Sequence, residues 1–127
     1  MELTRVLLAE DDPFIRRVSE VALKRAGFEV TAVGDGVEAL QLMEDAIPDV
    51  ILLDGMMPKM DGVEVCRRIK ADPRFSHLPV IMLSARSQAS DEEEGRRAGA
   101  IGYIRKPFDA FELASQVRTL CAADPLG

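Results

Sequence analysis

The chain has 127 residues, the size of one ordinary globular domain, and 47% of them are apolar, which is enough to form a core. Its apolar runs are far shorter than the roughly 20 residues of a membrane span, and a secretory signal is not recognisable, so we expect a cytoplasmic protein without membrane contact. A net charge of −6, without a dense cluster of Lys and Arg, argues against direct contact with nucleic acid. We expect a single domain over residues 1–127, with its core at about 4–121.

The first predicted strand is the apolar run Arg5–Ala9. A helix is predicted to begin at Asp12 and Pro13, because an Asp cap accepts hydrogen bonds from the N–H groups of the first turn and Pro presets φ there. Gly27 predicts the end of this helix, since glycine readily adopts the left-handed conformation that commonly follows a helix.

The same alternation of strand and helix continues along the chain. A strand is predicted at Glu29–Val33 and a helix at about Gly36–Asp45, where apolar residues recur at helical spacing. The next strand, Val50–Leu53, is apolar throughout, as expected for a strand covered on both faces. A third helix is predicted at about Asp61–Ala71, with apolar residues on one side.

The last two units follow the same plan. A strand is predicted at Val80–Ser84, and the helix after it is marked by Ser90, which has a glutamate three residues later in a capping-box pattern. The fifth strand is predicted at Ile101–Ile104, and the fifth helix from Asp109 until Asp124. The sequence therefore predicts an α/β protein with a five-stranded parallel sheet between helices.

Polar side chains stand where the predicted strands end. Glu10, Asp11 and Asp54 follow the first and third strands, while Ser84 and Lys106 lie at the ends of the fourth and fifth. Sites in open parallel sheets gather beyond the carboxyl ends of the strands. We therefore expect these five side chains to converge in one pocket.

Acids next to apolar strands would repel one another and lose hydration unless a cation compensated them. Oxygen ligands without Cys or His favour Mg²⁺ over Zn²⁺. Lys106 would pair with Asp54 at rest and with a phosphoryl oxygen afterwards, and the Ser84 hydroxyl would donate to another oxygen. Acid, metal, ammonium and hydroxyl together are typical of phosphoryl transfer to a carboxylate.

Four segments in this order resemble the receiver domains of two-component response regulators, a family that includes the chemotaxis response regulator. They read VLLAEDD at 6–12, DVILLDGMMPKMDG at 49–62, PVIMLSA at 79–85 and YIRKPF at 103–108. The resemblance covers about residues 4 to 121. It implies a flavodoxin-like fold, a five-stranded parallel sheet of order 2-1-3-4-5 with helices on both faces.

The resemblance also implies roles for residues of the acidic site. Asp54 is then the phosphoacceptor, and Asp11 is a direct Mg²⁺ ligand. Glu10 is a ligand acting mainly through water, and Met56 contributes its backbone carbonyl oxygen rather than its sulfur. By this resemblance the protein is not an enzyme for other substrates, but a signalling phosphoacceptor that catalyses only its own phosphorylation and dephosphorylation.

Further residues are implied to report the phosphorylated state. Ser84 is similar to the hydroxyl residue that moves toward the phosphoryl group, Tyr103 to the family's aromatic reporter, and Lys106 to its lysine, with Lys106–Pro107 resembling its cis peptide. The implied output face is formed by the fourth helix, fifth strand and fifth helix. The implied partners are a sensor histidine kinase or phosphotransfer protein and a downstream effector domain or protein, with phosphorylation-dependent dimerisation left open.

Some acids are interpreted as structural. Asp12 either caps the first helix or joins the acidic site, and capping is favoured because Glu10 and Asp11 better match the family's acidic pair. The run Asp91–Glu94 is interpreted as a solvated helix start, where negative charge suits the helix dipole.

Other positions differ from the usual family sequence or are expected to affect how long the phosphoryl group persists. Ile101 and Gly102 stand where many receivers carry two acids, so a dimer interface built on acids there is not expected. Met56 and Arg86 occupy positions that flank the path of the hydrolytic water in similar domains. Their bulk predicts slow loss of the phosphoryl group.

Two other functions use similar residues but fit this sequence less well. A phosphatase of the aspartyl-phosphate type also uses an Asp nucleophile with Mg²⁺, but typically carries Asp-x-Asp, whereas Met56 is the second residue after Asp54. A receiver-like scaffold that takes no phosphate usually lacks an acid or the lysine, and none is missing here.

Overall fold

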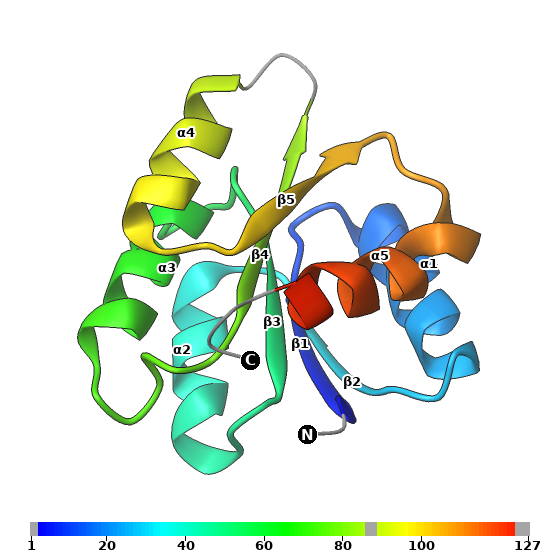
Figure 1. The fold of residues 1–127 in the computed structure, drawn as a ribbon, viewed down its shortest axis with the longest axis horizontal. Coiled ribbons are helices and arrows are strands. Elements are labelled where there is room, and N and C mark those ends of the chain that lie inside the picture. The colour runs from blue at the N-terminus through cyan, green and yellow to red at the C-terminus, as the bar shows by residue number, and fades with distance from the viewer. Residues whose placement is uncertain (1–2, 86–88, 124–127) are drawn as a thin grey trace.

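The computed structural model describes residues 3–85 and 89–123 of the chain. Its parallel sheet has the order β2-β1-β3-β4-β5, as the family resemblance implies (Figure 1). The strands are β1 Arg5–Ala9, β2 Glu29–Val33, β3 Val50–Asp54, β4 Val80–Ala85 and β5 Gly102–Lys106. The helices are α1 Pro13–Arg25, α2 Gly36–Asp45, α3 Gly62–Ala71, α4 Ala89–Ala98 and α5 Ala110–Ala123.

The two faces of the sheet are covered by different helices. Helices α1 and α5 pack on one face, where Leu23, Leu113 and the strand residue Leu52 belong to one buried cluster. Helices α2, α3 and α4 lie on the other face, where Met43 and Ile69 belong to a second cluster (Figure 1). Every residue of β3 is buried. Because β3 is packed on both faces, its carboxyl end is held in a fixed position at the edge of the sheet.

Aspartates cap four of the described helices, and their side chains fix where each helix begins. Asp12 accepts hydrogen bonds from the N–H groups of Phe14 and Ile15, and the Asp35 and Asp61 side chains each accept one from the third helical residue. At the start of α5, Asp109 Oδ1 accepts a hydrogen bond of 2.8 Å from the N–H of Phe111. Each cap satisfies donors that have no partner within the helix. The favoured interpretation of Asp12 is therefore confirmed.

Boundaries in the second half of the chain differ slightly from the predicted ones. Helix α4 is described from Ala89, so Ser90 lies within it rather than at its predicted start. Strand β5 begins at Gly102 and continues to Lys106, beyond the predicted end at Ile104, because β4 pairs with it as far as Lys106. The predicted helix stop at Asp124 falls outside the described residues.

Within the described ranges, none of the helices is both long and apolar enough to cross a membrane. Cys66 and Cys121 are buried and are not joined in a disulfide. Burial raises the pKa of the Cys66 thiol to about 11, so this side chain behaves as an apolar packing group.

Candidate functional site

Two paired strands bring three carboxylates together at the carboxyl edge of the sheet. Ala9 of β1 is in register with Leu53 of β3, so Glu10 and Asp54 follow at neighbouring positions. One carboxylate oxygen from each of Glu10, Asp11 and Asp54 lies within 4.8 Å of the others. The structure thus places in one cluster the acids that the sequence predicted to converge.

Lys106 reaches this cluster from the end of β5. Its Nζ lies 3.3 Å from Asp54 Oδ1 and forms a second ion pair with Glu10 Oε1. The peptide bond between Lys106 and Pro107 is cis, as the resemblance implies. Among the described residues, Lys106 is the cation that pairs with these carboxylates, so one ammonium faces three acids and the described cluster keeps an excess of negative charge when its acids are ionised.

The protein environment favours protonation of two of these acids. Glu10 is fully buried, Asp54 is 5% exposed, and Asp11 is exposed. Burial raises the pKa of Asp54, and the neighbouring Glu10 adds to this effect. The pKa of Asp11 is also raised, first by its hydrogen bond with Asp54 and then by burial. A cation bound among the carboxylates would relieve this repulsion.

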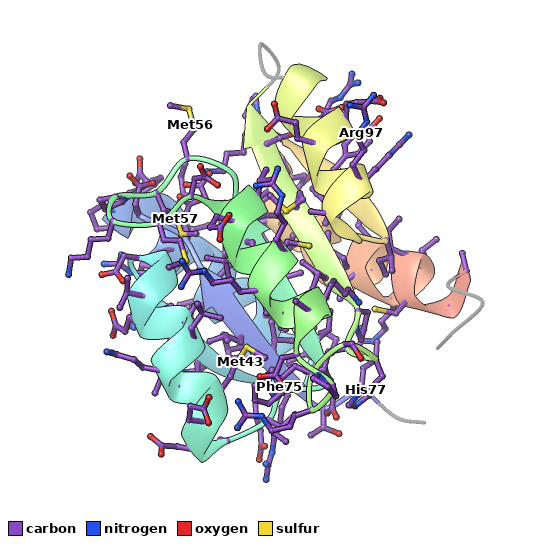
Figure 2. The ribbon with its side chains drawn as sticks, turned by 90° about the vertical axis from the view of Figure 1, so that its left-hand side faces the viewer. Met43, Met56, Met57, Phe75, His77 and Arg97 are labelled. Atoms are coloured by element: carbon purple, nitrogen blue, oxygen red, sulfur yellow. The ribbon has the colours of Figure 1, made fainter. Side chains whose placement is uncertain are left out.

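A cleft opens beside Asp11, lined also by Gly55, Met56, Met57, Pro58, Asp61, Val63 and Glu94. The Met56 side chain is 60% exposed and projects from the rim into solvent (Figure 2), while its backbone N–H donates a hydrogen bond of 3.1 Å to Asp54 Oδ1. The loop after β3 is thereby held close to Asp54. Arg86, predicted to act with Met56, lies outside the described residues.

Ser84 lies near the end of β4, one residue beyond the register partner of Asp54. Its side chain is buried, and its hydroxyl donates a hydrogen bond of 2.9 Å to Glu92 Oε2. The predicted hydroxyl is thus at the correct edge of the sheet, but its proton is engaged with helix α4 rather than with the acidic cluster.

Glu92 corrects the interpretation of Asp91–Glu94 as a solvated run. Glu93 and Glu94 are exposed, whereas Glu92 is only 6% exposed and also accepts hydrogen bonds of 3.2 Å from Arg105 Nε and Nη2. Burial works to raise the pKa of Glu92, but the hydrogen bonds from Arg105 and Ser84 outweigh it and lower that pKa. The carboxylate is therefore kept ionised in a buried position.

A sequence signal for Glu92 exists three residues further along, at Gly95. A Cβ there would lie 2.8 Å from Met82 Cγ of β4, so this side of α4 approaches the sheet closely. Residues three apart share one face of a helix, which places Glu92 on the sheet-facing side. Gly95 is the one local feature that marks this side of α4, and its meaning depends on the contact with Met82 that only the structure shows.

Tyr103, the predicted reporter, is the second residue of β5 and is half-buried. The guanidinium carbons of Arg96 and Arg105 lie 4.9 Å and 5.4 Å from the centre of its ring. The ring therefore sits between α4 and a residue that also binds Glu92, an arrangement that links Tyr103 to the surroundings of Ser84.

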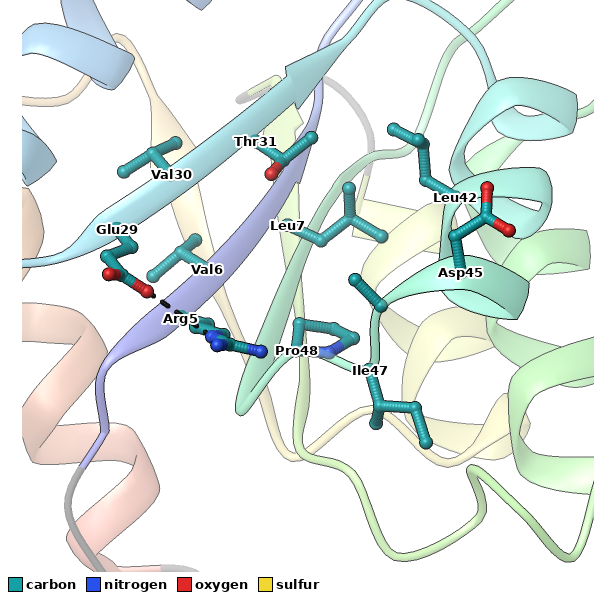
Figure 3. A pocket seen from close by; sticks show the side chains of 11 residues that line it. Arg5, Val6, Leu7, Glu29, Val30, Thr31, Leu42, Asp45, Ile47 and Pro48 are labelled. Carbon is teal, nitrogen blue, oxygen red and sulfur yellow. Dashed lines mark hydrogen bonds and ion pairs between the residues drawn. The ribbon is translucent and has the colours of Figure 1, made fainter.

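A separate groove of about 360 Å³ lies at the opposite edge of the sheet, beside the start of β1 and β2 and the end of α2 (Figure 3). Arg5 and Glu29 form an ion pair of 3.3 Å at this groove. Its acids, Glu29 and Asp45, are not among those that could share a metal ion in the described part of the chain. The acids that could share a metal ion among the described residues lie at the carboxyl edge of the sheet.

Known proteins are similar to the chain in both sequence and fold. The family model for the response regulator receiver domain matches residues 6–118. The transcriptional regulatory protein CseB of Streptomyces avermitilis is 46% identical over 119 residues, which are 94% of this chain but 49% of CseB. The chain thus spans about half the length of such curated relatives.

Solved structures agree with this relationship. A putative response regulator from Chloroflexus aurantiacus superposes with a TM-score of 0.89 at 34% identity, covering 95% of this chain and 99% of its own. The chemotaxis response regulator CheY4 of Vibrio cholerae gives a TM-score of 0.87 at 31% identity, covering 94% and 99%. The chain belongs to the family of response regulator receiver domains of two-component signalling.

Proposed function

We propose that Asp54 accepts a phosphoryl group in a Mg²⁺-dependent reaction and that this modification changes the surface formed by α4, β5 and α5. The observation that carries the proposal is the convergence of Glu10, Asp11, Asp54 and Lys106 from three strands at one edge of the sheet. Phosphoacceptor chemistry is characteristic of the family to which the chain belongs.

The donor set suits a hard divalent cation. It consists of carboxylate oxygens, two of them on acids with raised pKa values, and it is only partly neutralised by Lys106. Asp11 and Asp54 would hold Mg²⁺ directly, Glu10 through water, and Met56 through its carbonyl oxygen. Bound there, the ion would offset the negative charge that donor and acceptor bring together.

The transfer itself requires little from the protein beyond position and charge. An Asp54 carboxylate oxygen attacks phosphorus, a new P–O bond forms, and the bond to the leaving group breaks. The donor is a phosphohistidine of a sensor kinase or phosphotransfer protein, or a small acyl phosphate. Lys106 Nζ, 3.3 Å from Asp54 Oδ1, is close enough to move to an oxygen of the transferred group.

The output is passed on by a change near β4 and β5. The new phosphoryl group carries acceptor oxygens for the Ser84 hydroxyl, and withdrawal of Ser84 alters the surroundings of Tyr103 and α4. CseB is named a transcriptional regulatory protein, which supports an effector that controls transcription as the downstream partner. Nucleic-acid contact then belongs to the effector, not to this acidic domain.

The test is uptake of a phosphoryl group from acetyl phosphate, followed by intact-protein mass spectrometry. We expect uptake with Mg²⁺, none with a chelator, and none in Asp54→Asn. Asp45→Asn serves as a charge-matched control, because Asp45 is exposed at the end of α2, beside the opposite edge of the sheet. Equal uptake by Asp54→Asn and the unaltered protein would refute the proposal.

A further inference from the structure

Glu92 is a buried carboxylate for which the proposed phosphoryl chemistry gives no role. Its side chain is 7% exposed, whereas the side chain of its neighbour Glu93 is 63% exposed. Glu92 Oε2 accepts hydrogen bonds from both Ser84 Oγ and Arg105 Nε, and Oε1 accepts one from Arg105 Nη2. A helix, α4, is thus joined through one carboxylate to two strands.

The geometry of the sheet makes this connection specific. Ser84 of β4 and Arg105 of β5 are register partners, so their side chains leave neighbouring strands on the same face. Glu92 lies above this pair and is bound by both. The charge of the buried carboxylate is compensated by Arg105, whose side chain is 56% exposed and belongs to the proposed output face.

A serine hydroxyl has one proton to donate. In this structure that proton is directed to Glu92, at an Oγ to Oε2 distance of 2.9 Å. A hydrogen bond to a carboxylate is stronger than one between neutral groups. The same proton is the one that Ser84 would offer to a phosphoryl oxygen on Asp54, so Glu92 and the phosphoryl group compete for it.

We propose that Glu92 is a positioning residue that holds the Ser84 hydroxyl away from Asp54 in the unphosphorylated protein, and that phosphorylation must transfer this hydrogen bond from Glu92 to the phosphoryl group. The inference rests on the proposed function, since it assigns a resting partner to the residue that recognises the product. The free energy of phosphorylation then includes the cost of breaking a hydrogen bond to α4.

The transfer has a direct consequence for the output face. When Ser84 turns to the phosphoryl group, Glu92 keeps its hydrogen bonds from Arg105, and this arginine also lies against the Tyr103 ring. The hydrogen bond between α4 and Ser84 of β4 is lost, while the hydrogen bonds between α4 and Arg105 of β5 remain. Phosphorylation therefore loosens one side of α4 rather than the whole helix.

The test uses the whole chain with Mg²⁺ and beryllofluoride, a mimic of the phosphoryl group, titrated while the fluorescence of Tyr103 is followed. Tyr103 is the only tyrosine, and tryptophan is absent from the sequence. We expect Glu92→Gln to bind the mimic about fivefold more tightly than the unaltered protein, because a charge-assisted hydrogen bond to Ser84 becomes a neutral one. Glu92→Met removes the acceptor altogether, so its gain should be larger.

Glu93→Gln is the matched control, since it removes the same charge from the next residue of α4, and its affinity should be unchanged. The gain in affinity from Glu92→Gln should disappear in the Ser84→Ala background, because alanine has no hydroxyl proton for Glu92 to hold. A purely structural role of Glu92 would alter the melting temperature without this dependence on Ser84.

The outcomes separate the two proposals. Mg²⁺-dependent binding to the unaltered protein, with Glu92→Gln at equal affinity or with a gain that persists in Ser84→Ala, would overturn the role of Glu92 and leave the proposed function standing. Failure of the unaltered protein to bind the mimic would overturn both.

Discussion

The Lys106 ammonium lies 3.3 Å from Asp54 Oδ1, although β3 and β5, which carry these residues, are separated in the sheet by β4. A long side chain from the edge strand thus reaches across its neighbour to the centre of the site. Because Lys106 also pairs with Glu10, a single cation holds acids from β1 and β3 in place. In the absence of a metal ion, the positive charge of Lys106 therefore compensates part of the negative charge of these acids.

Replacing Lys106 by Met should lower the free energy of unfolding in Mg²⁺-free buffer by about 2–3 kcal/mol, because Glu10 and Asp54 lose the partner of their buried charges. The same change should strengthen Mg²⁺ binding about tenfold, since a positive charge beside the ligands is removed. Urea unfolding and calorimetric titration measure the two effects. Lys59→Met, which removes an exposed lysine paired with Asp35, is the control. Unaltered Mg²⁺ affinity in Lys106→Met would show that the lysine and the ion do not share ligands.

Replacing Asp11 by Asn should raise the melting temperature of the metal-free protein at neutral pH. The pKa of Asp11 is raised in the folded state, so the unaltered protein loses stability as pH rises through that pKa, and Asn escapes this loss. The advantage should shrink as pH falls below about 4, the ordinary carboxyl range, where Asp11 itself takes up a proton. Thermal melts across pH test the sign, and an advantage that grows toward acid pH would contradict it.

Replacing Gly62 by Ala should destabilise the fold by about 3 kcal/mol, because a Cβ there would stand 2.2 Å from the backbone oxygen of Asp54, which cannot move independently of the sheet. Gly27→Ala offers a comparison. Gly27 has a φ of +101° but open space around its Cβ position, so only backbone strain of about 1 kcal/mol is expected. Chemical denaturation measures the loss of stability in both variants. Equal losses in Gly62→Ala and Gly27→Ala would rule out steric contact with Asp54 as the cause.

Asp12 should be replaceable by Asn but not by Ala. Its Oδ1 accepts hydrogen bonds of 2.9 Å and 3.1 Å from the first turn of α1, and an Asn cap is about equally effective. We expect Asp12→Asn to keep its stability within about 0.5 kcal/mol and its phosphorylation rate within about twofold, and Asp12→Ala to lose about 1 kcal/mol of stability. Stopped assays with acetyl phosphate measure the rate, and a collapse in Asp12→Asn would make Asp12 part of the chemical site.

Much of the fold could be predicted because local signals agree with the tertiary structure. The caps Asp12 and Asp61 and the apolar strand Val50–Leu53 each specify an element by their own chemistry. The ends of β5 were harder to predict from the sequence, because pairing with β4 rather than composition extends that strand to Lys106. Local patterns contain no information about how far a neighbour extends.

The site shows the same division. Glu10, Asp11, Asp54 and Lys106 were predictable, because parallel strands deliver their carboxyl ends to one edge of the sheet. Glu92 was misinterpreted, because its acidic neighbours suggested a solvated run. Its burial depends on the close approach of α4 to β4 and on a partner, Arg105, from another strand. Such long-range compensation of a buried charge is not written in the local sequence.

The most direct measurement is to locate the phosphoryl group after incubation with acetyl phosphate and Mg²⁺. Reduction of an aspartyl phosphate with borohydride converts the modified aspartate to homoserine, which peptide mass spectrometry assigns to a single position. The account predicts conversion at Asp54 alone, and only when Mg²⁺ is present. Conversion at another acid with Asp54 intact, or equal labelling in the presence of a chelator, would contradict it.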